Sequence, residues 1–205
     1  MQIAKTLPQP AVISRYVAAQ ESSDLDLLEK IAAGDRPAMR TLYGRHSVRV
    51  FRFVLRLIGD ESRAEDLVSE VFFDVWRQAG RFEGRSQVST WILAIGRYKA
   101  ITALRQRREE ALDEDFAEAI ADPADDAEQT LAKRDISIRL QRCLQQLSAE
   151  HREIIDLVYY HEKSVEEAAE IVGVPCGTVK TRMFYARKRI ADLLAQSEGA
   201  PRTRQ

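Results

Sequence analysis

Basic and hydroxyl side chains between residues 178 and 189 have the types and spacing that suit contact with nucleic acid. Ser164 and Glu167 have the spacing of a helix capping box, Gly173 suits a left-handed turn, and no acidic residue follows the turn until Asp192. In a helix-turn-helix, the second helix presents its N-terminal side chains to base edges and its basic flank to phosphates. The predicted duplex-binding residues are Thr178, Lys180, Thr181, Arg182, Tyr185, Arg187, Lys188 and Arg189.

A second basic segment, residues 81 to 105, mixes arginines, aromatic rings and short polar side chains. Gly80 and Gly84 frame a polar loop that leads into a predicted helix. Basic grooves with aromatic platforms are how proteins hold single strands of nucleic acid. The predicted single-strand residues are Arg81, Arg85, Ser86, Gln87, Trp91, Tyr98, Lys99 and Arg105. For Trp91, a place in the core is the favoured alternative to nucleic-acid contact.

Acidic side chains recur at helical spacing between residues 63 and 78, where a helix is predicted. Glu65, Asp66, Glu70 and Asp74 make up the set. Such a face suits a basic partner helix, and an ordinary solvated face is the alternative.

The sequence offers no constellation for catalysis or metal binding. Three histidines are scattered, and neither a glycine-rich phosphate loop nor a nucleophile motif occurs. The two cysteines, Cys143 and Cys176, lie too far apart for a metal-ligand motif. We therefore expect no enzyme activity, cofactor, metal or small-molecule substrate. Cys176 lies near a predicted helix N-terminus, a position where a thiol can be reactive, and its oxidation is a hypothesis for modulating DNA binding.

The elements that would position these residues are all helical. Hydrophobic residues make up 45% and charged residues 31% of the 205 positions, with only 9 glycines and 6 prolines. This composition and the helical periodicity predict an all-α fold of two small domains joined by a flexible acidic linker. The expected division is a flexible tail at 1–21, a four-helix domain at 22–108, the linker at 109–135, the helix-turn-helix domain at 136–196 and a tail at 197–205.

Charge and hydropathy indicate the cellular compartment in which we expect the protein. The formal net charge is −1, because the acid of residues 109–135 offsets locally basic helices on either side. No stretch approaches the roughly 18 apolar residues of a membrane span, and the first 20 residues lack a signal-peptide pattern. We expect a cytoplasmic protein without membrane contact.

Three segments together resemble the extracytoplasmic-function (ECF) sigma factors of bacterial RNA polymerase. AEDLVSEVFFDVWR is similar to that family's polymerase-binding segment, FEGRSQVSTWILAIGRYKAITALRQRR to its −10 recognition and strand-opening segment, and PCGTVKTR to its −35 reader. The resemblance covers about residues 24–108 and 136–195, and the order of the segments is also that of the family.

The resemblance implies a role for each surface. Asp66, Glu70 and Asp74 would contact the clamp coiled coil of the largest polymerase subunit, and the loop from Phe82 to Ser89 would capture a base flipped from the non-template strand. An anti-sigma factor and a stress or environmental response are further implications. Tyr98 and Thr102 replace a frequent asparagine and aspartate of the family, so its −10 base preference is not carried over.

The predicted linker is long enough for two-site binding to one promoter. About 25 residues span at most roughly 80–90 Å, and elements about 17 base pairs apart are separated by about 58 Å. A stand-alone helix-turn-helix regulator is the main alternative to a sigma factor, and it leaves the loop and the acidic helix without a role. A recombinase is the enzyme alternative, but only Tyr185, with Arg182 and Arg187, matches part of such a site.

Overall fold

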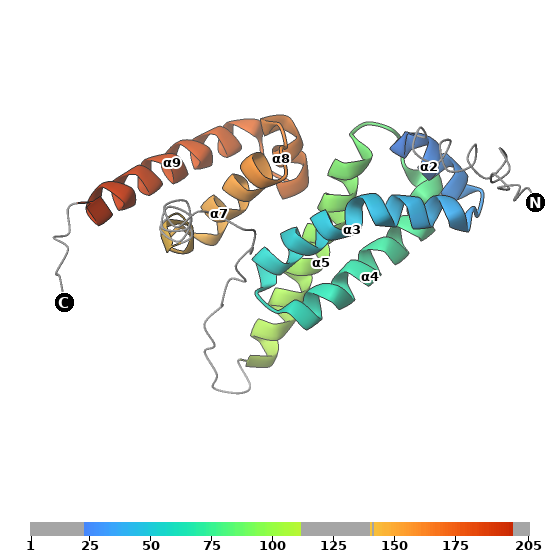
Figure 1. The fold of residues 1–205 in the computed structure, drawn as a ribbon, viewed down its shortest axis with the longest axis horizontal. Helices are drawn as coiled ribbons and strands as arrows, with labels where there is room; N and C mark the ends of the chain where they lie inside the picture. Colours follow the sequence, from blue (N-terminus) through green and yellow to red (C-terminus); the bar gives the residue numbers. More distant parts are fainter. Residues whose placement is uncertain (1–22, 112–139, 141, 199–205) are drawn as a thin grey trace, which may run out of the picture.

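Every regular element in the described part of the chain is a helix (Figure 1). The computed structural model describes residues 23–111, 140 and 142–198. Its elements are α2 (Asp24–Ala32), α3 (Arg36–Ile58), α4 (Glu61–Gln78), the 3₁₀ turn η1 (Ala79–Arg81), α5 (Val88–Ala111), α7 (Ala149–Ile155), the π-helical turn η2 (Asp156–Tyr160), α8 (Val165–Val172) and α9 (Cys176–Glu198). The all-α prediction is confirmed. The predicted tails at 1–21 and from 199 onward, and the linker from residue 112, lie outside the described residues.

Short polar residues start the helices, as their N-cap preferences require. Ser23 and Asp26 form a capping box at α2, and the carboxylate of Asp35 accepts the amide N–H of Ala38 at 3.1 Å at the start of α3. Gly59 ends α3 in the left-handed region, at φ 70°, where a residue without a Cβ is least strained. These caps fix where α2 and α3 begin and where α3 ends.

Helices α2 to α5 enclose an apolar core. Phe53 and Val54 on α3, Val71 on α4 and Ile92 on α5 have no exposed surface. Gly96 brings α5 close to α3, because a Cβ at this position would lie 3.5 Å from the side chains of Val50 and Val54. The result is a four-helix unit with one face of each helix turned inward.

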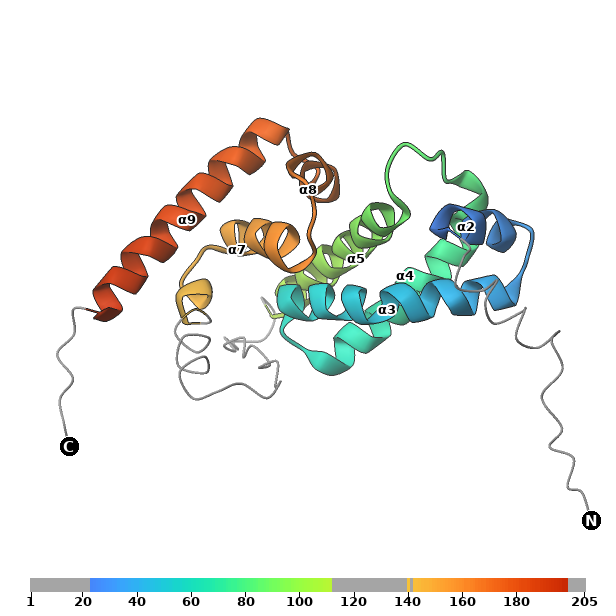
Figure 2. The same ribbon diagram turned by 45° about the horizontal axis from the view of Figure 1, so that its top comes forward.

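The second helical unit, from α7 to α9, packs directly on α3 and α5 (Figure 2). Ile154, Leu157, Ala168 and Val179 belong to the same continuous cluster of buried apolar residues as the core of the first unit. A smaller cluster around Leu147 and Ala186 joins α7 to α9. The helix-turn-helix is therefore held against the first unit.

The described helices include none that is both long and apolar enough to cross a membrane.

Candidate nucleic-acid interface

The helix-turn-helix has the local structure that its sequence predicts. The Ser164 hydroxyl accepts the amide N–H of Glu167 at 3.1 Å, and the Glu167 carboxylate accepts the amide N–H of Ser164 at 2.9 Å. Gly173 ends α8 with φ 71°, and its N–H donates to the carbonyl of Ala169. Ala168 and Ala169 are buried at the crossing with α9, which small side chains allow.

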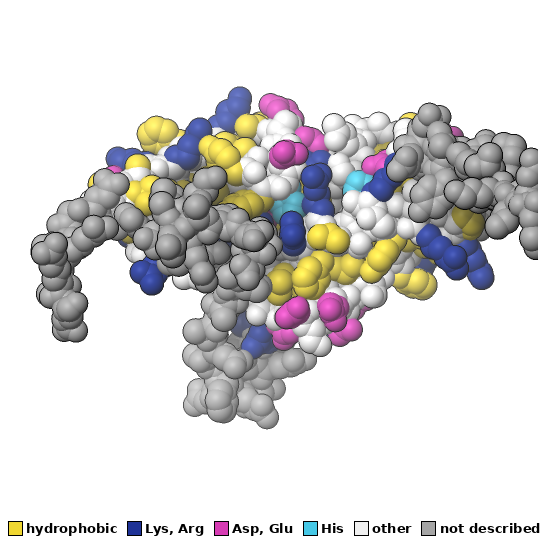
Figure 3. Space-filling model, viewed as in Figure 1, with side chains coloured by type: hydrophobic (Ala, Val, Ile, Leu, Met, Phe, Trp, Pro, Cys, Tyr) yellow, Lys and Arg dark blue, Asp and Glu magenta, His cyan; other side chains and the backbone are white. Residues whose placement is uncertain are grey.

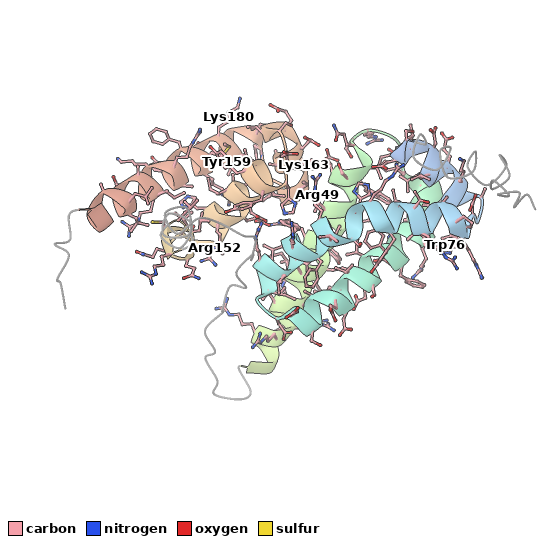
Figure 4. The ribbon with its side chains drawn as sticks, viewed as in Figure 1. Arg49, Trp76, Arg152, Tyr159, Lys163 and Lys180 are labelled. Atoms are coloured by element: carbon pink, nitrogen blue, oxygen red, sulfur yellow. The ribbon has the colours of Figure 1, made fainter. Side chains whose placement is uncertain are left out.

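Helix α9 divides into a buried face and an exposed basic face. Val179, Met183 and Ala186 recur at a spacing of three to four residues and point inward, so the intervening positions point outward. Lys180 projects away from the rest of the molecule (Figure 4). The exposed predicted residues are Lys180, Thr181, Tyr185, Arg187, Lys188 and Arg189.

Two predicted residues of α9 are less available to DNA than the others. Arg182 is mostly buried, and its Nη2 lies 2.9 Å from Oε2 of Glu150 on α7. Thr178 is half-buried. Phe184, which the sequence analysis did not select, is 60% exposed and packs edge-on against Tyr185 at 5.4 Å between ring centroids. In the sequence, the position of this aromatic residue between Arg182 and Arg187 was the signal that could have identified Phe184 as a candidate contact.

The loop between η1 and α5 is polar and largely exposed. Gly84 has φ 69° and lets the chain turn, while Arg85 is exposed and pairs with Glu83 at 2.6 Å. Beneath the loop, the half-buried Trp91 packs on Phe82 at 5.1 Å between ring centroids and against the core. Trp91 therefore supports the loop from the core side, in line with the favoured alternative for this residue.

A cavity of about 300 Å³ opens between this loop and α2. Its lining comes from α2 and from the loop and the start of α5, and comprises Asp24, Leu25, Phe82, Gly84, Ser86, Gln87, Val88 and Ser89. Burial by itself would raise the pKa of Asp24, but hydrogen bonds from Arg45 and His46, at 2.7 Å each, hold that pKa below its usual value. Asp24 thus places a carboxylate at this cavity, and the sequence analysis gave it no role.

Tyr98, Lys99 and Arg105 of α5 do not share one face. Tyr98 is 73% exposed and Arg105 is exposed. Lys99 instead points toward α4, where its Nζ lies 3.2 Å from Glu70 and 2.8 Å from Asp74. Burial opposes the charge of Lys99, yet these two carboxylates raise its pKa above the usual value. A residue predicted for single-strand contact is therefore paired with two predicted for polymerase contact.

The acidic side of α4 is open at its start. Asp66 and Glu65 are exposed, and Phe73 further along is 59% exposed under the guanidinium of Arg77. Figure 3 shows hydrophobic side chains over α3 and α4 next to acidic side chains over α4. Leu67, Phe72 and Val75 are core residues, while Trp76 is only half-buried.

The histidines and cysteines have structural surroundings. His46 is buried beside Asp24, and His161 is buried edge-on to Phe53, at 5.3 Å between ring centroids. Cys143 is buried and Cys176 is half-buried in the first turn of α9. Within the described residues, no group of three or more His, Cys, Asp or Glu could hold a metal ion. The redox role of Cys176 stays a prediction.

The comparisons with known proteins agree with one another on the family. Residues 42–110 match the model of Sigma-70 region 2, and residues 137–190 match that of Sigma-70, region 4. The ECF RNA polymerase sigma factor SigK of Mycobacterium tuberculosis is 29% identical over 177 residues, which are 84% of this chain and 95% of SigK. The RNA polymerase sigma factor CarQ of Myxococcus xanthus is 30% identical over 174 residues, 83% of this chain and 97% of CarQ.

A solved structure extends the likeness to three dimensions. The sigma factor RpoE of Bartonella quintana, in its co-crystal structure with the anti-sigma factor NepR, superposes with a TM-score of 0.63 at 30% identity, over 76% of this chain and 96% of that one. The two family matches fall one on each of the two helical units described above. The chain therefore belongs to the ECF family of RNA polymerase sigma factors.

Proposed function

We propose that this sigma factor binds core RNA polymerase through α4 and directs it to promoters with two separate DNA-reading surfaces. The basic face of α9 reads the −35 element in duplex DNA, and the loop before α5 holds the −10 element as a single strand. The observation that carries the proposal is the occurrence of these two surfaces on separate helical units of one chain. A stand-alone regulator would need only the first.

The exposed face of α9 supports duplex recognition. Lys180 and Thr181 are exposed in its first turns, and Lys188 and Arg189 extend the positive charge along it. Side chains at the start of a recognition helix reach base edges, whereas those further along reach phosphates. The −35 contacts are therefore concentrated at Lys180 and Thr181.

The cavity under the loop supports capture of a flipped base. Ser86, Gln87 and Asp24 are among the residues that line it, and hydroxyl, amide and carboxylate groups offer hydrogen-bond donors and acceptors for a base edge. Extruding a base costs a few kcal/mol, and holding it there assists strand opening. Tyr98, exposed further along α5, offers a stacking platform for a neighbouring base.

The protein contributes recognition, and the polymerase carries out nucleotide addition. Sigma factor RpoE of Bartonella quintana is held by an anti-sigma factor, and a partner of the same kind is proposed here, within a stress or environmental response.

Co-elution with bacterial core RNA polymerase, followed by promoter-dependent transcription, tests the proposal. Asp66→Arg should weaken the complex by about tenfold or more, because it places a cation against a basic partner surface. Glu29→Arg makes the same charge change on the exposed side of α2 and should leave the complex intact. A wild-type chain that ignores core polymerase but binds duplex DNA tightly would establish the stand-alone regulator instead.

A further inference from the structure

Charged side chains are buried where the second helical unit meets the first. Glu153 of α7, Asp156 of η2 and Lys163 before α8 are each less than a tenth exposed. All three face the first unit, and Figure 4 shows Lys163 at this junction, near Arg49. A buried charge without a partner is strongly unfavourable, so in this closed arrangement each of these residues requires a partner.

Lys163 is the most completely satisfied of the three. Its Nζ lies 2.7 Å from Oγ of Ser89, 3.0 Å from Oγ1 of Thr90 and 3.0 Å from Oε1 of Glu167. An ammonium group has three N–H donors, and all three have acceptors here. Thr90 in turn donates its hydroxyl to Glu167 at 2.5 Å. The start of α5 and the start of α8 are thereby joined by a closed network of hydrogen bonds.

The backbone next to Lys163 is specialised for this contact. Glu162 has φ 54°, a left-handed conformation that residues with a side chain rarely adopt. The N–H of Lys163 donates to the carbonyl of Leu157 at 2.9 Å. The turn therefore directs Lys163 inward while the side chain of Glu162 stays exposed. Strained backbone of this kind persists where surrounding contacts hold it in place.

Two arginines of the first unit complete the junction. Arg97 on α5 binds Glu153 through two bonds, from Nε at 2.6 Å and from Nη2 at 3.3 Å. Arg56 on α3 binds Asp156 and lies over the ring of Tyr160 at 4.2 Å. The fork of a guanidinium fixes the direction as well as the distance of its partner, so the pairs specify one relative position of the two units.

This position is incompatible with simultaneous binding to both promoter elements, an argument that rests on the proposed function. Helix α8 contacts both α5 and α9. With packed helix axes about 8–10 Å apart, the start of α9 lies within roughly 25 Å of the start of α5. The two elements are about 58 Å apart at 17 base pairs. The two readers must therefore separate before both can be occupied.

We propose that Lys163 and the pairs Arg97–Glu153 and Arg56–Asp156 form a polar latch that holds the free chain closed. The latch opens before the two DNA-reading surfaces act on one promoter. The exposed face of α9 stays accessible in the closed state, whereas the face of α5 that carries Thr90 and Arg97 is covered by the second unit. Closure thus limits two-site recognition and leaves −35 recognition by itself unaffected.

A charge-swap experiment on the full chain tests the latch. Arg97→Glu and Glu153→Arg each place like charges together, and each should raise the radius of gyration in X-ray scattering by about a quarter, since a closed chain has the dimensions of one compact body. The double variant Arg97→Glu/Glu153→Arg restores opposite charges and should return to the wild-type value. Arg36→Glu, an equal charge change at the exposed start of α3, should have no effect.

Circular dichroism separates opening from unfolding, because an opened variant keeps its helical signal. The latch would be overturned if the radius of gyration stayed at the wild-type value in both single variants. It would also be overturned if the double variant were expanded while remaining as helical as wild type. Binding to a −35 duplex should be equal in all these variants. The scattering measurement does not depend on DNA or polymerase. A double variant with the wild-type radius of gyration therefore supports the latch even if core polymerase does not bind and the proposed function is wrong.

Discussion

The interior of the first helical unit and its junction with the second differ in chemistry. The core of α2 to α5 is built from fully buried apolar residues such as Phe53, Val54 and Val71, with His46 as a buried polar member. The junction buries Glu153, Asp156, His161 and Lys163. Apolar groups lose their stabilisation when they are exposed to water, whereas paired charges are satisfied either by each other or by water. The junction adds these buried charges to an apolar cluster that continues from the core, and the difference identifies it as the contact that separates in the proposed latch, since interfaces between domains are usually the more polar ones.

The largest effect should come from the apolar core. Leu67→Ala removes a side chain that is 2% exposed on α4 and should lower the free energy of unfolding by about 2–5 kcal/mol through lost burial and a residual cavity. Chemical denaturation measures it, with Ser69→Ala on the exposed side of α4 as the control, expected within about 0.5 kcal/mol of wild type. A loss under about 1 kcal/mol would contradict the description of this core.

A smaller, pH-dependent effect should come from the junction. Burial alone would raise the pKa of Glu167, but hydrogen bonds from Thr90, the backbone of Ser164 and Lys163 lower it from 4.5 to about 2. A carboxyl whose pKa is lowered in the folded state stabilises that state fully when the pH is above the pKa of the unfolded chain. This contribution is lost as the pH falls toward the pKa of the folded state, here between about pH 4.5 and about pH 2. The contribution is at most about 3 kcal/mol.

The variant Glu167→Gln isolates this contribution. Its unfolding free energy should lie below that of wild type at pH 6, and the difference should shrink as the pH is lowered through 4 toward 3. Glu166→Gln changes an exposed neighbour and serves as the control for other carboxylates that titrate in the same range. A difference that is constant with pH would show that the charge of Glu167 does not stabilise the junction.

The smallest effect concerns the exposed face of α9, which neither core nor junction constrains. Lys188→Ala should weaken binding to a −35 duplex, with the slope of log affinity against log salt reduced by about 1, because one phosphate contact is lost. Titration at several salt concentrations measures the slope, and Arg40→Ala on α3 is the control. An unchanged slope accompanied by altered base preference would assign Lys188 to a base edge instead.

Local structure followed closely from the sequence, because its determinants are close in the chain. The capping box of Ser164 and Glu167, the left-handed Gly173 and the apolar spacing of Val179, Met183 and Ala186 define the helix-turn-helix within about 20 residues. The order of the polymerase-binding, −10 and −35 segments also led to the sigma family, which the comparisons confirm. The individual contacts of the site residues stay predictions.

Only the tertiary structure revealed which charges are buried. In the sequence, Arg97, Glu153, Asp156 and Lys163 resemble the solvated charges that surround any helix, and Lys163 finds Ser89 from 74 positions away. Similarly, Lys99 was expected at the single-strand surface but pairs with Glu70 and Asp74 on α4. Helical periodicity records which face of a helix is apolar. It does not record which distant carboxylate or hydroxyl meets a charged side chain, since that depends on how whole helices pack.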